Sequence, residues 1–118
     1  MSGSLGYNAQ FANIIAALFA ATGQDLAHIS EGSMGMTVMR LNDDGSLYVS
    51  VYLPSLLIGV VGGGTGLSTQ SELRALTGAS TSTDLAEIAA AAVLAGELSL
   101  HASLAEGTLA KAHMKLGR

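Results

Sequence analysis

The first helical segment of the chain has large apolar residues three and four positions apart, the spacing of an α-helix: Phe11, Ile14, Ile15, Leu18 and Phe19. Asn8 is a suitable helix start, and Gly23 is a suitable stop. Because alanines fill most of the remaining positions, this helix is apolar almost all round. The pattern predicts a central helix that packs against neighbours on several sides.

Two segments typical of β-strands follow, over residues 36–41 and 47–53. The turn between them contains Asp44-Gly45, a pair common in tight hairpins, so we expect an antiparallel hairpin. Pro54 cannot donate to a strand ladder and should end the second strand. Residues 57–61 are again apolar and partly β-branched, which predicts a further strand.

The second half of the chain is predicted to be helical. Thr69 and Glu72 have capping-box spacing, which predicts a short helix over residues 68–77. Asp84 and Glu87 repeat this spacing before an alanine-rich segment.

We expect a long helix over about 84–98 and another from about residue 100 or 103 to 115. Gly96 and Gly107 are candidate breaks or close-packing points. The predicted fold is therefore α+β, with a central apolar helix, an antiparallel hairpin, a further strand and C-terminal helices. We expect one domain over residues 1–118.

The composition is unusually apolar. Hydrophobic residues make up 49% of the 118 residues and charged residues only 12%. A surface of this kind is too apolar for a comfortable monomer and predicts a buried partner surface. We expect a homodimer or an assembly with further polypeptide.

Charge and residue usage exclude several other classes of function. The net charge of −4 and the absence of a basic stripe argue against nucleic-acid binding. With no cysteine, the chain has no disulfide or thiolate chemistry. Met34, Met36 and Met39 are expected to fill core gaps, and no acid and histidine spacing predicts a metal site. No apolar run reaching about 18 residues was identified, so no membrane partner and a cytoplasmic location are expected.

Residues 58–65 read IGVVGGGT, a β-branched run followed by three consecutive glycines. A backbone without Cβ atoms permits very close approach by a ligand or by another segment. A tight strand-to-helix connection with no ligand explains such a run about equally well. A dinucleotide-binding fingerprint of the Rossmann type fails, because Leu67 stands where its last glycine is required.

Four segments, in this order, resemble those of 3-hydroxy-3-methylglutaryl-coenzyme A reductases. They are GYNAQFANIIAALFAATGQD at residues 6–25, IGVVGGGT at 58–65, AGELSL at 95–100 and KAHM at 111–114. The resemblance implies the C-terminal part of the large catalytic domain, without the small NADP-binding domain. It also implies reduction of hydroxymethylglutaryl-CoA to mevalonate and coenzyme A with two NADPH or NADH, at a site shared between the subunits of a dimer.

The resemblance assigns roles to several residues. It places Gly62, Gly63, Gly64 and Thr65 at the nicotinamide end of the cofactor. It makes Asp25 a catalytic residue, although the sequence alone favours a turn residue or the N-cap of a short helix near residues 26–29.

The resemblance also makes His113 the residue that protonates the departing coenzyme A thiolate. By itself, a lone histidine at this place is more often an exposed surface residue. Asn13, with Gln10 beside it, is implied to support substrate binding.

Some positions depart from the family pattern. Gln10 stands where histidine is usual, and Thr108 and Ala112 replace a histidine and a serine. His28 and His101 match nothing functional. The lysine and glutamate that complete the family's active site have no counterpart here, so the chain alone is expected to be inactive. The alternative is a non-catalytic dimerisation or interaction module that keeps the fold.

Overall fold

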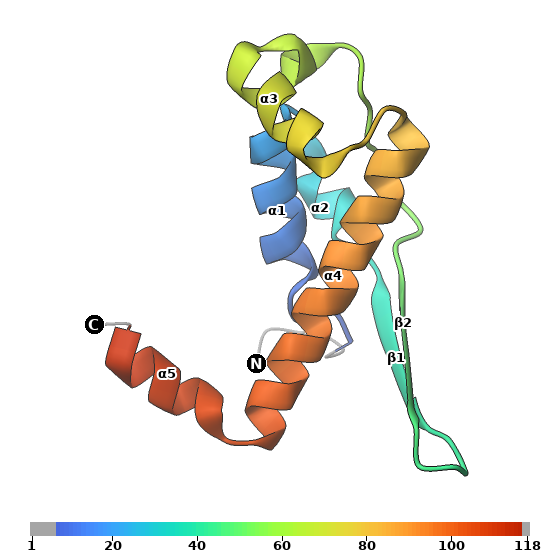
Figure 1. Ribbon diagram of the computed structural model, residues 1–118, viewed down its shortest axis with the longest axis vertical. Coiled ribbons are helices and arrows are strands. Elements are labelled where there is room, and N and C mark those ends of the chain that lie inside the picture. The colour runs from blue at the N-terminus through green and yellow to red at the C-terminus, as the bar shows by residue number, and fades with distance from the viewer. Residues whose placement is uncertain (1–6, 117–118) are drawn as a thin grey trace.

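The computed structural model describes residues 7–116 and confirms an α+β fold. In chain order its elements are α1 (Phe11–Thr22), η1 (Leu26–His28), α2 (Ile29–Gly32), β1 (Met36–Leu41), β2 (Leu47–Tyr52), η2 (Gly63–Gly66), α3 (Ser68–Thr77), α4 (Ser82–Ala105) and α5 (Thr108–Leu116). Figure 1 shows α1 and α4 side by side, with α3 above them. The hairpin and α5 extend away from this centre.

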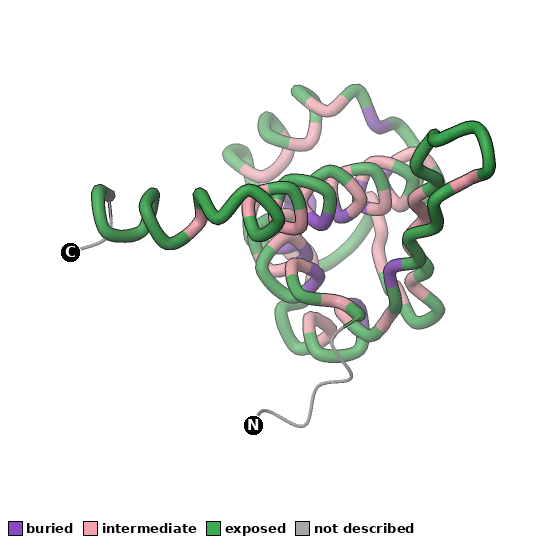
Figure 2. Tube along the Cα trace, turned by 90° about the horizontal axis from the view of Figure 1, so that it is seen from below, coloured by how far each residue is buried: buried purple, intermediate pink, exposed green. Residues whose placement is uncertain are grey.

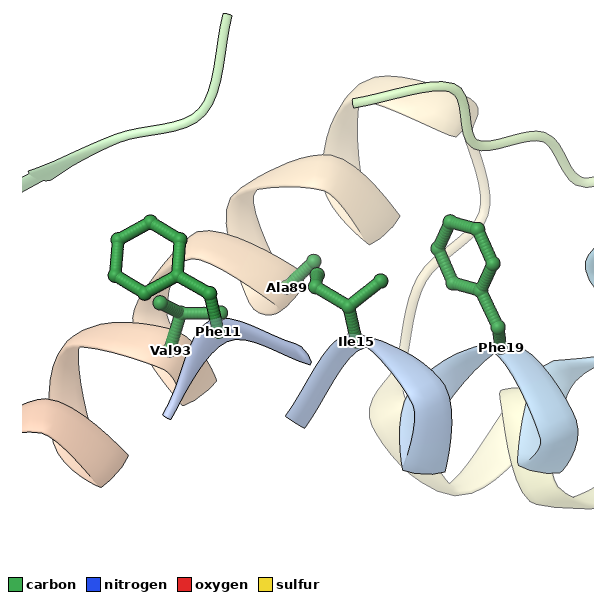
Figure 3. Packing of buried hydrophobic residues seen from close by; sticks show 5 residues of the cluster. All are labelled: Phe11, Ile15, Phe19, Ala89 and Val93. Carbon is green, nitrogen blue, oxygen red and sulfur yellow. The ribbon is translucent and has the colours of Figure 1, made fainter. Parts of the chain in front are cut away.

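The core lies where α1 crosses α4. Phe11, Ile15 and Phe19 recur every four residues on one face of α1. Phe11 lies beside Val93 of α4 and Ile15 beside Ala89, while Phe19 lies farther along α1 (Figure 3). All five side chains are fully buried. Fully burying side chains of this size stabilises a fold by about 1.5–3 kcal/mol each. This contact is therefore the main source of stability in the described chain.

The predicted start, stop and packing of α1 are partly confirmed. Gly23 ends the helix at φ 71, a left-handed conformation in which glycine avoids the Cβ penalty. The expected start at Asn8 is wrong, because the helix begins at Phe11 with Gln10 as its N-cap, and Asn8 contributes only its carbonyl oxygen, 3.4 Å from the Phe11 nitrogen. The expected packing on several sides is wrong in part, because Ala12, Asn13, Ala17 and Ala20 are exposed along one face.

The predicted hairpin is confirmed. β1 and β2 pair antiparallel, from Met36 opposite Tyr52 to Leu41 opposite Leu47. Residues on one face approach the core through Thr37 and Val51, while the other face carries exposed large side chains: Met36, Val38, Tyr48 and Tyr52. The expectation that the methionines fill core gaps is therefore wrong for Met34, Met36 and Met39, which are all exposed.

The further strand predicted over residues 57–61 is wrong: these residues have no strand assignment, and the sheet within residues 7–116 has two strands. The Gln24 side chain makes the hydrogen bonds that a neighbouring strand would otherwise make. Gln24 Nε2 donates to the Gly59 carbonyl at 2.8 Å, and the Gly59 N–H donates to Gln24 Oε1 at 2.8 Å. Because these backbone groups are satisfied, the segment needs no strand partner there.

The C-terminal helices form, with different boundaries and caps. α3 occupies the predicted residues 68–77, but neither Thr69 nor Glu72 caps it. The capping box belongs instead to Thr81 and Asp84, which begin α4.

α4 runs through Gly96 without a break and ends before Gly107, which has φ 66. A Cβ at Gly96 would lie 3.1 Å from Ile14 Cγ1, so Gly96 is a close-packing point between α4 and α1.

α4 is longer and more apolar than the sequence analysis recognised. By length and composition alone it could cross a membrane, which corrects the earlier statement about apolar runs. A single helix of this kind is weak evidence for a span, because core helices of soluble proteins have the same composition. Figure 2 shows its buried residues along the side that meets α1, while the hairpin tip and most of α5 are exposed.

Candidate functional site

A shallow hollow forms where the end of α1 meets the glycine-rich segment. Residues 23–25 and His28 line one side, and residues 57–59 and 61–63 with Thr65 line the other. Its volume is about 220 Å³ and it is widely open. Ligand pockets commonly measure about 300–1,000 Å³, so this hollow is smaller than a usual ligand site.

Two different physical causes favour glycine in this segment, positive φ at some positions and close backbone packing at another. Gly62 and Gly63 have φ 86 and 55, and a Cβ at Gly62 would meet nothing within 4 Å. Gly64 instead packs against Gly23, where a Cβ on Gly23 would lie 2.3 Å from the Gly64 carbonyl oxygen. The close approach expected from the sequence is thus made in part by another segment of this chain, while Gly62 keeps an open face.

Thr65 and Arg74 hold the glycine turn in place. Thr65 is buried, and its hydroxyl donates to the Gly62 carbonyl at 2.6 Å. Arg74 of α3 donates through Nη1 to the Val60 carbonyl at 3.2 Å. The Thr65 hydroxyl and the Thr65 N–H, which lies 3.2 Å from the same carbonyl oxygen, are therefore both engaged within the turn.

Asp25 lies on the rim of the hollow, just after Gly23. Its side chain is 68% exposed, and its Oδ1 accepts a hydrogen bond from the Ala27 N–H at 2.9 Å. This makes Asp25 the N-cap of η1, as the sequence alone favoured. The second carboxylate oxygen, Oδ2, faces His28, whose Nε2 lies 3.8 Å away.

His28 is held between two carboxylates. Its Nδ1 lies 2.7 Å from Glu31 Oε2, and its Nε2 points to Asp25. The hydrogen bond to Glu31, helped by the charges of Glu31 and Asp25, raises the pKa of His28 above its usual 6.5 despite partial desolvation. His28 matches no functional residue of the family, but the i, i+3 and i+6 spacing of Asp25, His28 and Glu31 is a sequence signal for this cluster.

Gln10 and Asn13 lie together at the opposite end of α1 from the hollow. Asn13 Nδ2 donates to Gln10 Oε1 at 3.1 Å, and Asn13 is exposed. The Gln10 N–H donates at 2.6 Å to Glu97 Oε1. The structure therefore joins the two predicted substrate residues to each other but places them away from Asp25.

Glu97 is a buried carboxylate that the sequence analysis did not single out. It has no exposed surface, Thr37 Oγ1 donates to its Oε2 at 2.8 Å, and His101 Nε2 lies 3.3 Å from the same oxygen. The signal was present, because Leu85, Ala89, Val93 and Glu97 are the buried residues of α4 and recur every fourth position. A charged residue on a buried stripe needs partners, and α1 and β1 supply them.

His113 is not brought to the hollow by this chain. It is exposed on α5, which follows α4 and extends away from the centre of the molecule (Figure 1). The structure therefore joins Asp25 with the glycine turn and leaves His113 on a separate helix.

Comparison with known proteins identifies the family. The family model for hydroxymethylglutaryl-coenzyme A reductase matches residues 1–118. The chain is 55% identical to 3-hydroxy-3-methylglutaryl-coenzyme A reductase of Methanocaldococcus jannaschii, over 100% of this chain and 30% of that protein. It is 54% identical to the Aeropyrum pernix reductase, over 99% of this chain and 30% of the relative. It also resembles reductase 1 of Arabidopsis thaliana, at 46% identity over 100% of this chain and 22% of the relative.

These similarities define a family of reductases, and the chain belongs to this family, the hydroxymethylglutaryl-coenzyme A reductases. The chain spans about 30% of the length of the archaeal relatives it matches.

Proposed function

We propose that this chain forms one wall of the active site of a hydroxymethylglutaryl-CoA reductase. The complete enzyme would reduce hydroxymethylglutaryl-CoA to mevalonate and coenzyme A with two NADPH or NADH. By itself the chain would be inactive, because the family's active site requires a lysine. The two lysines of this chain, Lys111 and Lys115, are exposed on α5 and do not line the hollow. A cytoplasmic location and pairing with further polypeptide or a second copy belong to the same proposal.

One observation carries this proposal. Asp25 and the glycines 62–63, far apart in the sequence, line the same open hollow. The open Cβ side of Gly62 leaves room for a flat group to lie against the backbone, as the nicotinamide end of a cofactor would. The nicotinamide, when bound, supplies the hydride.

The residues of this chain would then perform three tasks. Gly62 and Gly63 present backbone to the cofactor ring without side-chain hindrance. Asp25 would hold or pass a proton near the carbonyl being reduced, through Oδ2, since Oδ1 is engaged with Ala27. His113 would protonate the thiolate that leaves, once assembly brings α5 to the site.

A specific observation also favours the alternative of a non-catalytic interaction module. Asp25 serves as an exposed helix cap, and one face of the hairpin displays large apolar side chains. Both features favour a chain whose function is to bind a partner rather than to catalyse a reaction.

Reconstitution separates the two functions. The chain would be combined with the remaining portion of an archaeal relative, and NADPH oxidation followed with hydroxymethylglutaryl-CoA. We expect turnover that is lost on Asp25→Asn or His113→Gln, by the 10²–10⁴-fold roughly typical of acid and base catalysts. Asp43→Asn in the hairpin turn and Lys111→Gln on α5 are the matched controls. Equal turnover in all four variants would remove the assigned roles, and no turnover in the unsubstituted protein would favour the interaction module.

A further inference from the structure

Among the described residues that line the hollow, His28 is the one whose side chain can carry a positive charge beside Asp25. The residues lining the hollow include no lysine or arginine. His28 faces Asp25 Oδ2 through Nε2 at 3.8 Å and Glu31 Oε2 through Nδ1 at 2.7 Å. A doubly protonated ring has an N–H toward each carboxylate, whereas a neutral ring has only one.

Three ionisable side chains, Asp25, His28 and Glu31, line two neighbouring hollows. His28 and Leu57 lie between the hollow that contains Asp25 and a second hollow, of about 360 Å³, that contains Glu31. The segment packed opposite, residues 53–67, contains no ionisable side chain. Among the described residues that line the two hollows, the ionisable side chains are Asp25, His28 and Glu31, while Arg74 of α3 hydrogen-bonds to the Val60 carbonyl and lines neither hollow.

We propose that His28 is a positioning residue for Asp25, acting as an imidazolium that Glu31 holds against the Asp25 carboxylate. The inference rests on the proposed function and deepens it, because it supplies from this chain a cation for the acid at the hollow. Asp25 is fixed by two contacts, with Oδ1 on the Ala27 N–H and Oδ2 toward the ring.

This arrangement gives the site a defined pH response. Glu31 raises the pKa of His28, chiefly through the hydrogen bond, so the cation persists to higher pH than on a free imidazole. When pH rises through the pKa of His28, the cation is lost and Asp25 faces a neutral ring. Activity that depends on this pair should then fall on the alkaline side.

The first test uses the chain itself and follows the His28 ring by NMR across pH. Glu31→Gln should lower the His28 midpoint strongly, and Asp25→Asn should lower it by a smaller amount. Glu106→Gln, which makes the same change in net charge beyond the end of α4, should leave it in place. If Asp25→Asn leaves the titration midpoint of His28 unchanged, the inference is wrong.

The second test uses a complete reductase that contains this chain, with turnover measured across pH. His28→Gln should reduce turnover and abolish the alkaline limb that His28 causes, whereas Glu31→Gln should shift that limb to lower pH. His28→Lys keeps a cation and should retain turnover above the pH at which the unsubstituted enzyme declines. An alkaline limb unchanged in His28→Gln would contradict the proposal. If the unsubstituted enzyme has no turnover, the proposed function fails, and the ring titration decides the role of His28.

Discussion

At the scale of single residues, Glu97 shows how much one buried side chain organises. Its two oxygens accept from the Gln10 N–H and the Thr37 hydroxyl, and His101 approaches one of them. It thereby joins the start of α1 and the hairpin to α4. A buried carboxylate is stable only with such partners, and its removal leaves the partners unsatisfied.

We predict that Glu97→Ala destabilises the chain by about 3 kcal/mol or more, since each buried polar group left unpaired costs about 1–3 kcal/mol. The measurement is the free energy of unfolding from urea denaturation. Glu87→Ala, at an exposed position of the same helix, should change it by no more than about 0.5 kcal/mol. Similar losses in both variants would show that Glu97 does not hold these elements together.

Local chemistry explains which residues could be predicted from the sequence. The stop at Gly23 and the turn at Asp44-Gly45 depend on backbone preferences of neighbouring residues, so the sequence predicted both. The strand expected over residues 57–61 failed because its backbone partner is the Gln24 side chain, 35 positions away. The grouping of Asp25 with the glycine turn came from family resemblance, whereas the contact of Gly23 with Gly64 is a tertiary feature.

At the scale of elements, the end of α1 and the glycine turn behave as one unit. Gly23 and Gly64 meet backbone to backbone, and the Gln24 amide clasps Gly59 beside them. The Gly23–Gly64 contact tolerates little change, because no flexible side chain lies between the two backbones to give way. The wall of the hollow therefore depends on close packing between two elements rather than on either element alone.

Comparison of two glycines tests this packing. Gly23 and Gly45 have nearly equal φ, 71 and 82, but a Cβ at Gly45 would meet nothing within 4 Å. Alanine at Gly45 should cost only the left-handed strain of about 1–2 kcal/mol. Alanine at Gly23 should cost clearly more, because it collides with the Gly64 carbonyl. Equal losses in thermal stability would mean that the two backbones do not need their close contact.

At the scale of the whole molecule, the chain is more open than an independent domain. Its radius of gyration is 15.9 Å, against about 13.5 Å for a compact domain of this length. Its accessible surface is 7713 Å², whereas a compact monomer of this mass exposes roughly 5,900 Å². The excess is comparable to one side of a large interface, and much of it is on the hairpin and α5.

We predict that the isolated chain self-associates through the outward face of the hairpin. Met36, Val38, Tyr48 and Tyr52 are exposed there, on a sheet that has two strands within residues 7–116. Val38→Lys should shift sedimentation toward monomer at a given concentration. Met114→Lys, at an exposed apolar position on α5, is the control and should not. If both variants sediment as the unsubstituted chain does, the hairpin is not the associating surface.

The course of α5 has one further consequence. Gly107 joins it to α4 at φ 66, and His113 is carried beyond that joint. With a rise of about 1.5 Å per residue, the imidazole lies roughly 8 Å along α5 from its first residue. A change in torsion at this single glycine therefore swings the imidazole through several ångströms while both helices stay intact. Under the proposed function, docking of further polypeptide would bring His113 to the hollow by reorienting α5, and neither helix would need to refold.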